Sequence, residues 1–360
     1  MHIPNPYENK HYKLYFILPI VLIIAALFFI PNIPQGIDLR GGLLITIFTP
    51  SEVTPAQIAQ IQSSLAEFSP SGVRSFSSPA GSGVEIELPS DEKLAKAEGL
   101  LAEMNKLNNE FVELEIAKSP LADQKKQDTL AKAGELNALF SSLALSGDVQ
   151  KDVLQAQQAF LDARSEYRQK IAAALSEVVS TETASFKEVG SSLSKFFVTK
   201  TREVVLYSFL FSAIIIFLVF RALAPSFAVI FGAAADIIIT AGIMGLLGIP
   251  LTLASVAALL MLIGFSLDTD VMLTARVIKR KEGTPAQRAF DAMKTGLTMN
   301  ASVLIAFGTL LLLSLWLQIP FYYQVGTVAV IGALVDSIAT WMGNAPLILW
   351  SVERKEKAGA

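Results

Sequence analysis

The ionisable residues in the apolar part of this sequence are few, and the acidic ones are all aspartates. Asp236, Asp268, Asp270 and Asp336 lie in long apolar stretches, and Lys294 stands just before another. A carboxylate at membrane depth costs at least about 2.5 to 3.5 kcal/mol on insertion scales, so such residues usually face a protein interior or a water path. Burial favours the neutral acid, which allows proton exchange. These five residues are candidates for ion coupling.

Asp268 and Asp270 are two residues apart, which is about 200° around a helix, so they cannot point at one partner. We expect only one of them to be the main site. Polar residues near the ends of the two successive apolar stretches could line a hydrated path; they are Ser266, Thr269, Thr274, Thr295, Thr298, Asn300 and Ser302. Two alternatives give the aspartates no part in transport. Asp236 and Asp336 could be neutral hydrogen-bonding groups in helix packing, and Asp268 and Asp270 an interfacial pair near a basic loop.

The composition indicates a membrane protein and excludes several kinds of site. Of 360 residues 52% are hydrophobic and 17% charged, with a mean hydropathy of +0.50. A net charge of −3 gives no support for nucleic-acid binding. The chain has no cysteine, and its two histidines, His2 and His11, precede the first apolar stretch. Proton chemistry within the fold must therefore use carboxylates, lysine or arginine. We find no phosphate-binding loop or nucleophile elbow, and we expect no enzyme activity, cofactor or metal site.

Six stretches are long and apolar enough to span a membrane, which takes roughly 20 residues each. They are residues 14–30, 204–220, 226–247, 251–267 with a polar extension to 276, 297–317 and 321–350. A cleavable signal peptide is the alternative for the first, but the residues that follow offer no small-x-small cleavage site. Gly242, Gly245 and Gly248 would allow another helix to approach closely. We predict a polytopic helical membrane protein with one span, a large domain and then five spans.

The positions of lysine and arginine predict the orientation, because these residues favour the cytoplasmic side. The 276–294 segment holds six of them, and both chain ends hold others. We therefore place both termini in the cytoplasm and residues 32–203 outside. The predicted parts are a cytoplasmic N-terminus 1–13, a first transmembrane helix 14–31, an extracytoplasmic domain 32–203, a five-helix bundle 204–350 with its basic loop 276–294, and a cytoplasmic tail 351–360.

The domain 32–203 holds 40 of the 61 charged residues. Its pattern predicts a strand 43–48, a helix 54–68 and a hairpin of 73–77 with 84–88, which is half of a ferredoxin-like unit. Residues 91–179 are rich in Ala, Leu, Lys, Glu and Gln and predict long helices, with breaks at 119–120 and 146–148. A strand over 185–189 would close the ferredoxin-like unit. About 91–180 would be a helical insertion, whose charges form a solvated face or a docking surface.

Several motifs, in order and spacing, resemble the SecD/SecF protein-export membrane proteins, most of all the archaeal type of SecF. Residues 36–42 (GIDLRGG) look like the G-x-D-φ-x-G-G signature after the first span, and 189–194 (VGSSLS) resemble the segment before the second. Further matches are 265–271 (FSLDTDV) with Arg276, 294–299 (KTGLTM), and 336–341 (DSIATW) with Asn344. By this resemblance Gly36, Asp38, Gly41, Gly42 and Arg276 are structural motif residues.

The resemblance implies an auxiliary subunit of the Sec translocase in the cytoplasmic membrane. Such a subunit pairs with a SecD-like protein, associates with the translocation channel and uses the ion-motive force to help move exported unfolded polypeptides. By analogy with SecD the fourth-span carboxylate falls on Asp268, whereas the bacterial SecF carboxylate would fall on Thr269. The family's fifth-span arginine falls on Lys294, which keeps the charge without the guanidinium fork.

A single coupling mechanism could use several of these candidate residues. Protonation of Asp268, Asp270 or Asp336 would change its pairing with Lys294, shift the inner helices and move the outer domain. Two other functions stay open from the sequence. One is an exporter of lipophilic small molecules or lipids of the wider resistance-nodulation-division superfamily, and the other is a non-conducting scaffold subunit of a membrane complex. The sequence does not decide between a proton and a sodium ion.

Overall fold

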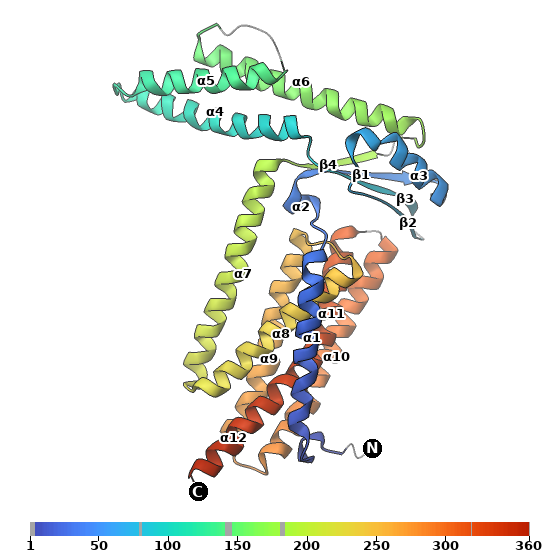
Figure 1. Ribbon diagram of the computed structural model, residues 1–360, viewed down its shortest axis with the longest axis vertical. Coiled ribbons are helices and arrows are strands. Elements are labelled where there is room, and N and C mark those ends of the chain that lie inside the picture. Colours follow the sequence, from blue (N-terminus) through green and yellow to red (C-terminus); the bar gives the residue numbers. More distant parts are fainter. Residues whose placement is uncertain (1–3, 79–80, 141–145, 181–183, 318, 360) are drawn as a thin grey trace. The chain divides into compact units, whose positions relative to one another are not determined.

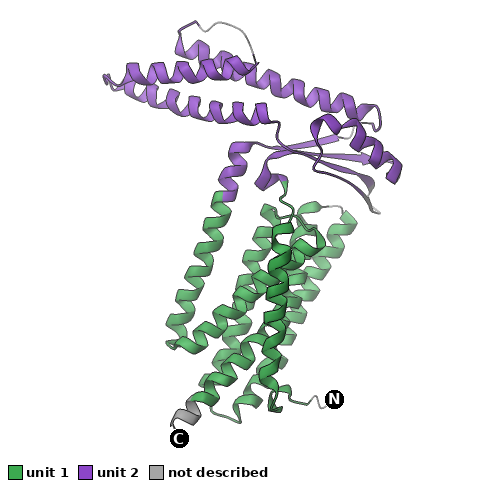
Figure 2. Ribbon diagram, viewed as in Figure 1, with its two compact units in different colours: residues 1–36, 199–360 green, residues 37–198 purple. Residues whose placement is uncertain are grey.

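The protein is described by a computed structural model covering residues 4–78, 81–140, 146–180, 184–317 and 319–359. His2 lies outside these residues. The chain divides into two units, one of residues 1–36 with 199–360 and one of residues 37–198 (Figure 2). The first unit contains most of the apolar helices and the second the sheet and the charged helices.

Within the described residues, six segments are long and apolar enough to cross a membrane, as the sequence predicts. They are Tyr12–Asn32, which includes α1 (Ile17–Phe29); α7 (Ser191–Phe220); α8 (Leu223–Leu247); α9 (Leu253–Lys279); α10 (Pro285–Leu317); and Pro320–Arg354 (Figure 1). Such helices satisfy every backbone hydrogen bond internally, which a membrane requires. The chain is a polytopic helical membrane protein.

Small residues bring α1 and α8 together. A Cβ atom on Gly242 would collide with Ala26, and one on Gly245 would collide with the backbone carbonyl of Phe29. The close approach predicted for this glycine series is therefore made by α1. Gly248 has another role, since it ends α8 with a φ of +67°, a conformation that glycine adopts without steric cost.

The last span is not one regular helix. It consists of α11 (Pro320–Ile338), a π-helical segment (Ala339–Asn344) and α12 (Ala345–Gly359). A π-helical turn is rare and turns the residues after it away from their α-helical positions. Tyr7 is buried and its hydroxyl donates a hydrogen bond to the carbonyl of Trp341, 2.9 Å away, within this segment.

The second unit contains an antiparallel sheet whose strand order, over the described residues, is β2-β3-β1-β4. Its strands are β1 (Gly42–Thr49), β2 (Gly72–Ser78), β3 (Gly81–Leu88) and β4 (Ala184–Val189). The turn at 79–80 of the predicted hairpin lies outside the described residues. Side chains alternate along a strand, so one face carries Ile45, Ile47 and Ile86, which pack against α3 (Pro55–Ser64) and the C-terminal part of α6.

Three long helices follow β3, with breaks where the sequence predicts them. They are α4 (Glu92–Ile116), α5 (Ala122–Phe140) and α6 (Val149–Ser176), shown in Figure 1. The first half of α6 packs with α4 and α5 around Met104, Leu136 and Ala156, and its second half packs on the sheet. We call α4, α5 and the first half of α6 the helical arm.

The motif that begins β1 has a clear structural reason. A short helix, α2 (Ile37–Arg40), precedes it, and Asp38 pairs with Lys187 of β4 at 3.0 Å. Gly41 and Gly42 have φ values of +78° and +135°, and a Cβ on Gly42 would collide with the carbonyl of Leu88. Only glycine fits this turn without strain.

Candidate functional site

Asp236 is fully buried in the middle of α8. Its Oδ2 atom accepts a hydrogen bond from the hydroxyl of Ser266 on α9, and its Oδ1 atom has no hydrogen-bond partner among the described residues. Both side chains lie well inside segments long enough to cross a membrane. A buried carboxylate oxygen without a donor is costly when ionised, so this carboxyl is suited to holding a proton.

Asp336 lies on α11, and both of its carboxyl oxygens accept a hydrogen bond, unlike those of Asp236. Asn300 of α10 donates to its Oδ2 atom at 2.7 Å, and Thr340 donates to its Oδ1 atom at 3.1 Å. The same amide group of Asn300 also donates to Ser337 at 3.0 Å. A carboxyl on one helix is thereby joined to a polar side chain on a neighbouring helix, which is the form that polar contacts between membrane helices take.

Asp270 on α9 is the third buried aspartate. Asn344 donates to its Oδ1 atom at 2.6 Å, while its Oδ2 atom is unpartnered among the described residues. A Cβ at Gly232 of α8 would collide with that Oδ2 atom, so the glycine provides the space for the carboxyl. Both aspartate and asparagine are completely buried.

These three carboxyls act on one another. The charges of Asp336 and Asp270 act on Asp236, and the charge of Asp336 acts on Asp270 as well. Neighbouring buried carboxyl groups cannot all remain ionised at low cost, and a proton on one of them reduces the repulsion. We call Asp236, Ser266, Asp270, Asn300, Asp336, Thr340 and Asn344 the buried polar cluster.

The π-helical segment builds one side of this cluster. Asn344 comes eight residues after Asp336, which on an ideal α-helix would place it about 80° away around the axis. The extra residue in a π-helical turn changes that angle, and Thr340 and Asn344 both reach aspartates, on different helices. Irregular helix turns of this kind are frequent at functional sites.

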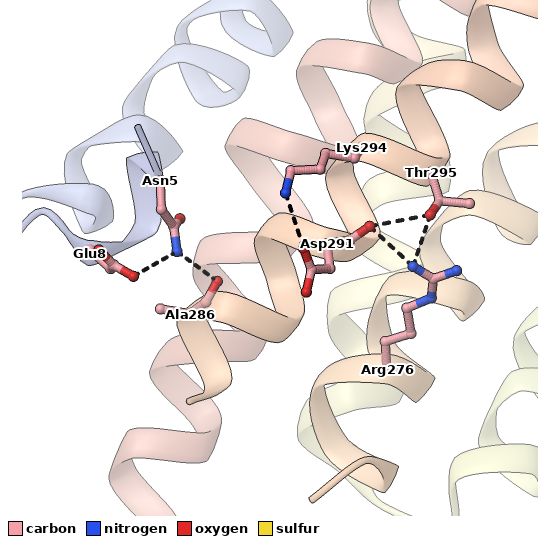
Figure 3. Close-up of polar contacts among 7 residues, drawn as sticks. All are labelled: Asn5, Glu8, Arg276, Ala286, Asp291, Lys294 and Thr295. Carbon is pink, nitrogen blue, oxygen red and sulfur yellow. Dashed lines mark hydrogen bonds and ion pairs between the residues drawn. The ribbon is translucent and has the colours of Figure 1, made fainter. Parts of the chain in front are cut away.

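Asp268 and Lys294, also candidates from the sequence, are placed differently. Asp268 has an exposed side chain on α9. Lys294 forms an ion pair with Asp291 at 3.2 Å, on the same helix (Figure 3). Its ammonium lies 4.2 Å from the ring centre of Phe290. The structure therefore brings Asp236, Asp270 and Asp336 together, and it shows the pairing of Lys294 with Asp291.

Arg276 joins the end of α9 to the start of α10. Its guanidinium donates to the backbone carbonyl of Asp291 at 3.0 Å and to the hydroxyl of Thr295 at 2.9 Å (Figure 3). The side chain of Asn5 donates to the carbonyl of Ala286, also on α10. These contacts are structural, and they hold the ends of helices that carry the buried polar cluster.

Sequence reasoning identified the aspartates but not their partners. Ser266 and Asn300 were expected to line a hydrated path, whereas in the structure they bind Asp236 and Asp336. Thr340 and Asn344 entered only through the motif match around Asp336. A signal was present, because polar residues recur at 336, 340 and 344, a spacing of four that places them near one another on a helix in the last apolar span.

Comparisons with known proteins agree with this architecture. Residues 170–354, just over half of the chain, match the family described as protein export membrane protein SecD/SecF, C-terminal. The protein-export membrane protein SecF of Methanothermobacter thermautotrophicus is 43% identical over 171 residues, which are 47% of this chain and 60% of that protein. SecF of Methanocaldococcus jannaschii is 40% identical over 169 residues, 46% of this chain and 60% of that protein.

One solved structure is similar over nearly the whole chain. The crystal structure of SecDF from Thermus thermophilus, called a translocon-associated membrane protein, superposes with a TM-score of 0.55 at 13% identity and covers 96% of this chain and 60% of that one. At this identity the likeness concerns the fold alone. The matches to the two curated relatives span 60% of the length of each. By the family match, this chain belongs to the SecD/SecF family of protein-export membrane proteins.

Proposed function

We propose that this chain is a SecF-type auxiliary subunit of the Sec protein translocase, located in the cytoplasmic membrane, and that it uses the ion-motive force to assist protein export. The observation that carries the proposal is the buried polar cluster, whose seven residues all lie in the segment that matches the SecD/SecF family. Burying three carboxyls at membrane depth is costly, and residues kept at such a cost usually mark a functional site.

The ion-coupling residues fall into two groups in this proposal. Asp236, Asp270 and Asp336 form the internal group. Asp268 and Lys294 form an external group, since both side chains are exposed on this chain. Polar groups in a membrane face protein or water rather than lipid, so the external group is expected to face a partner or a water path.

A SecD-like subunit is the partner that we propose for this face. Lys294, Thr298 and Ser302 follow one another at intervals of four residues on α10 and line a shallow depression. Little of α7 and α10 is buried in the single chain, and apolar side chains such as Phe211 and Ile305 are exposed on their surfaces. An apolar helix face suits lipid or another helix, whereas the polar row on α10 suits a protein partner.

The proposed arrangement of the second unit is ferredoxin-like. The strand order β2-β3-β1-β4, antiparallel at each pairing, supports it, as do α3 and α6 on one face of the sheet. The helical arm would be its insertion. We place this unit outside the cytoplasm and both termini inside, because the basic residues gather in the 276–294 segment and at the chain ends. The exported polypeptide and the translocation channel are its proposed partners there.

Gradient-driven export into membrane vesicles tests the proposal. We expect Asp270→Asn to abolish most of the stimulation by an ion gradient, because an amide cannot carry a charge or exchange a proton at neutral pH. Asp268→Asn and Lys294→Ala should each reduce it. Asp123→Asn on the helical arm is the matched control, since it removes an aspartate outside both groups.

Unchanged stimulation in all three membrane variants would contradict the coupling role. Purification from mild detergent with identification of the co-purifying membrane proteins tests the partners separately. A SecD-like protein should be recovered with the full chain, and its absence together with that of any channel subunit would contradict the assignment to the translocase.

A further inference from the structure

An N-terminal segment, residues 5–16, is bound to the membrane bundle near both of its ends. The side chain of Asn5 donates a hydrogen bond to the carbonyl of Ala286, in the first turn of α10, at 3.2 Å (Figure 3). The hydroxyl of Tyr12 donates to the carboxylate of Glu353 on α12 at 2.6 Å. These two contacts hold the segment against α10 and against the end of the last span.

Tyr7 is the most deeply buried residue of this segment. Its side chain is 3% exposed and belongs to an apolar cluster that includes Phe290 of α10 and Ile348 of α12. Its hydroxyl donates to the backbone carbonyl of Trp341 at 2.9 Å, and the sulfur atom of Met293 lies 3.7 Å away. Helices in a membrane normally satisfy their own carbonyls. The contact therefore requires a reason why this carbonyl accepts from outside its helix.

Pro346 provides that reason. In a π-helical turn, the carbonyl of each residue accepts from the N–H five residues later, and the N–H of Ala345 donates to the carbonyl of Thr340 in this way. The next donor in the same register would be residue 346, which is proline and has no N–H. The carbonyl of Trp341 thus has no backbone donor in this register, and the hydroxyl of Tyr7 takes its place.

The same proline would leave a different carbonyl unpaired in a regular α-helix. There it would be the carbonyl of Met342, four residues before Pro346. A buried carbonyl without a donor is costly, so the form of the helix that pairs its free carbonyl is favoured. Because the Tyr7 hydroxyl lies at Trp341, it favours the π-helical form over the regular one.

The π-helical form determines where Asn344 lies. A regular helix over the same residues would turn Asn344 around the axis by about 100°, since a π-helical turn contains one residue more. In the structure Asn344 donates to Asp270 at 2.6 Å. We propose that Tyr7 is a positioning residue, which holds the π-helical segment in the form that keeps Asn344 on Asp270. The inference rests on the proposed function, in which Asp270 belongs to the internal group.

Hydrogen exchange of the full chain in detergent tests the pairing of Tyr7 with the last span. Tyr7→Phe keeps the ring and removes the hydroxyl, so exchange of the amides of residues 345–352 should become about tenfold faster, because a buried carbonyl loses its donor. In a Pro346→Ala chain, residue 346 has an N–H of its own. Adding Tyr7→Phe to that chain should change exchange by less than about twofold.

Tyr15→Phe is the matched control for this measurement. Tyr15 is a partly buried tyrosine of the same segment, packed against the same apolar cluster, and its hydroxyl makes no hydrogen bond within the described residues. Its loss should leave exchange unchanged. Equal acceleration by Tyr7→Phe with and without Pro346 would overturn the proposal, because the hydroxyl would then not be replacing the missing N–H.

Gradient-driven export into membrane vesicles tests the effect on Asn344. Tyr7→Phe and Asn344→Ala should each lower the stimulation in part. The double variant should export no worse than Asn344→Ala alone, because Tyr7 acts through Asn344. Tyr15→Phe should export normally. A double variant clearly worse than Asn344→Ala, or normal export by Tyr7→Phe, would overturn the positioning role.

The inference and the proposed function can fail separately. If Pro346→Ala removes the effect of Tyr7→Phe on exchange while the unmodified chain gives no gradient-driven export, the pairing of Tyr7 with the last span stands and the function in export is wrong. If export depends on the gradient while Tyr7→Phe changes neither exchange nor export, the function stands and the role of Tyr7 is wrong.

Discussion

Two aspartates of this protein, Asp152 and Asp236, are equally buried and are held in opposite ways. Asp152, at the start of α6, accepts bonds from the backbone N–H and the hydroxyl of Ser146 and from the N–H of Gly147, all within 2.8 Å. Asp236 in α8 has one hydroxyl donor and a free oxygen atom among the described residues. The two buried carboxyls therefore differ in the number and the kind of their hydrogen-bond donors.

The kind of donor explains the difference. Burial alone would raise the pKa of Asp152, but the hydrogen bonds from Ser146 and Gly147 outweigh it and lower that pKa. A backbone N–H can only donate, so it fixes the ionised form. A hydroxyl can donate or accept, so Ser266 suits Asp236 in either protonation state. Burial of an aspartate by itself therefore does not indicate function, whereas the donors around it separate a structural carboxylate from an exchangeable one.

The largest difference in stability should appear when one buried aspartate of each unit is replaced, in separate variants, by a neutral residue. Asp152→Ala leaves three donors without their acceptor, and bonds to charged groups are worth about 1.5–3 kcal/mol each, so we expect a loss of about 3 kcal/mol in the stability of the helical arm. Asp270→Asn should change stability by less than about 1 kcal/mol, because it removes a carboxyl that is costly to bury. Hydrogen exchange of α5 and α6, with thermal unfolding in detergent, measures both.

Asp162→Asn is the control for the arm, since Asp162 is an exposed acceptor on the same helix. Its exchange pattern should match that of the unmodified chain. If Asp270→Asn destabilises the protein as much as Asp152→Ala does, the contrast between the two kinds of carboxyl is wrong.

The next largest effect should be the change in the stability of the helical arm with pH. An aspartate in an unfolded chain has a pKa near 3.9, and that of Asp152 is lower when folded, so its ionised form favours folding. This contribution is complete above about pH 4 and is lost as the pH falls through the folded pKa. The arm should therefore resist pepsin down to about pH 4 and open below it.

Asp152→Asn separates this effect from general acid denaturation. The variant lacks the titrating group, so its arm should be more sensitive to pepsin at every pH, with a weaker change below pH 4. Opening of the unmodified arm well above pH 5 would show that another group controls it.

The arm and the sheet could be predicted because local signals decide them. Pro120 and Gly147 interrupt long runs of helix-forming residues, and α5 and α6 begin just after them. Alternation along 84–88 predicted the buried face of β3. The three donors of Asp152 could not be predicted, because they come from a loop conformation that the pattern of hydrophobic residues does not specify.

The membrane site was predictable in part for a similar reason. A carboxyl in an apolar span is visible in the sequence, so Asp236, Asp270 and Asp336 were found. The choice of Asp270 over Asp268 as the buried member depends on how α9 is rotated against α8, where Gly232 leaves space. The contact of Asn344 depends on a π-helical turn. Both are properties of packing between helices, which spacing along one helix does not determine.

The smallest effect on the stability of the arm should come from a charged residue that is only partly buried, Lys125. Lys125 and Glu110 form an ion pair of 2.6 Å between α5 and α4, which lowers the pKa of the Glu110 carboxyl chiefly through its hydrogen bond. Ion pairs that stay in contact with water contribute little, because water screens them and two long side chains lose freedom. Lys125→Ala should leave hydrogen exchange in the arm unchanged at physiological salt. A destabilisation as large as that of Asp152→Ala would mean that surface charge, rather than the donors around the buried carboxylate, holds the arm together.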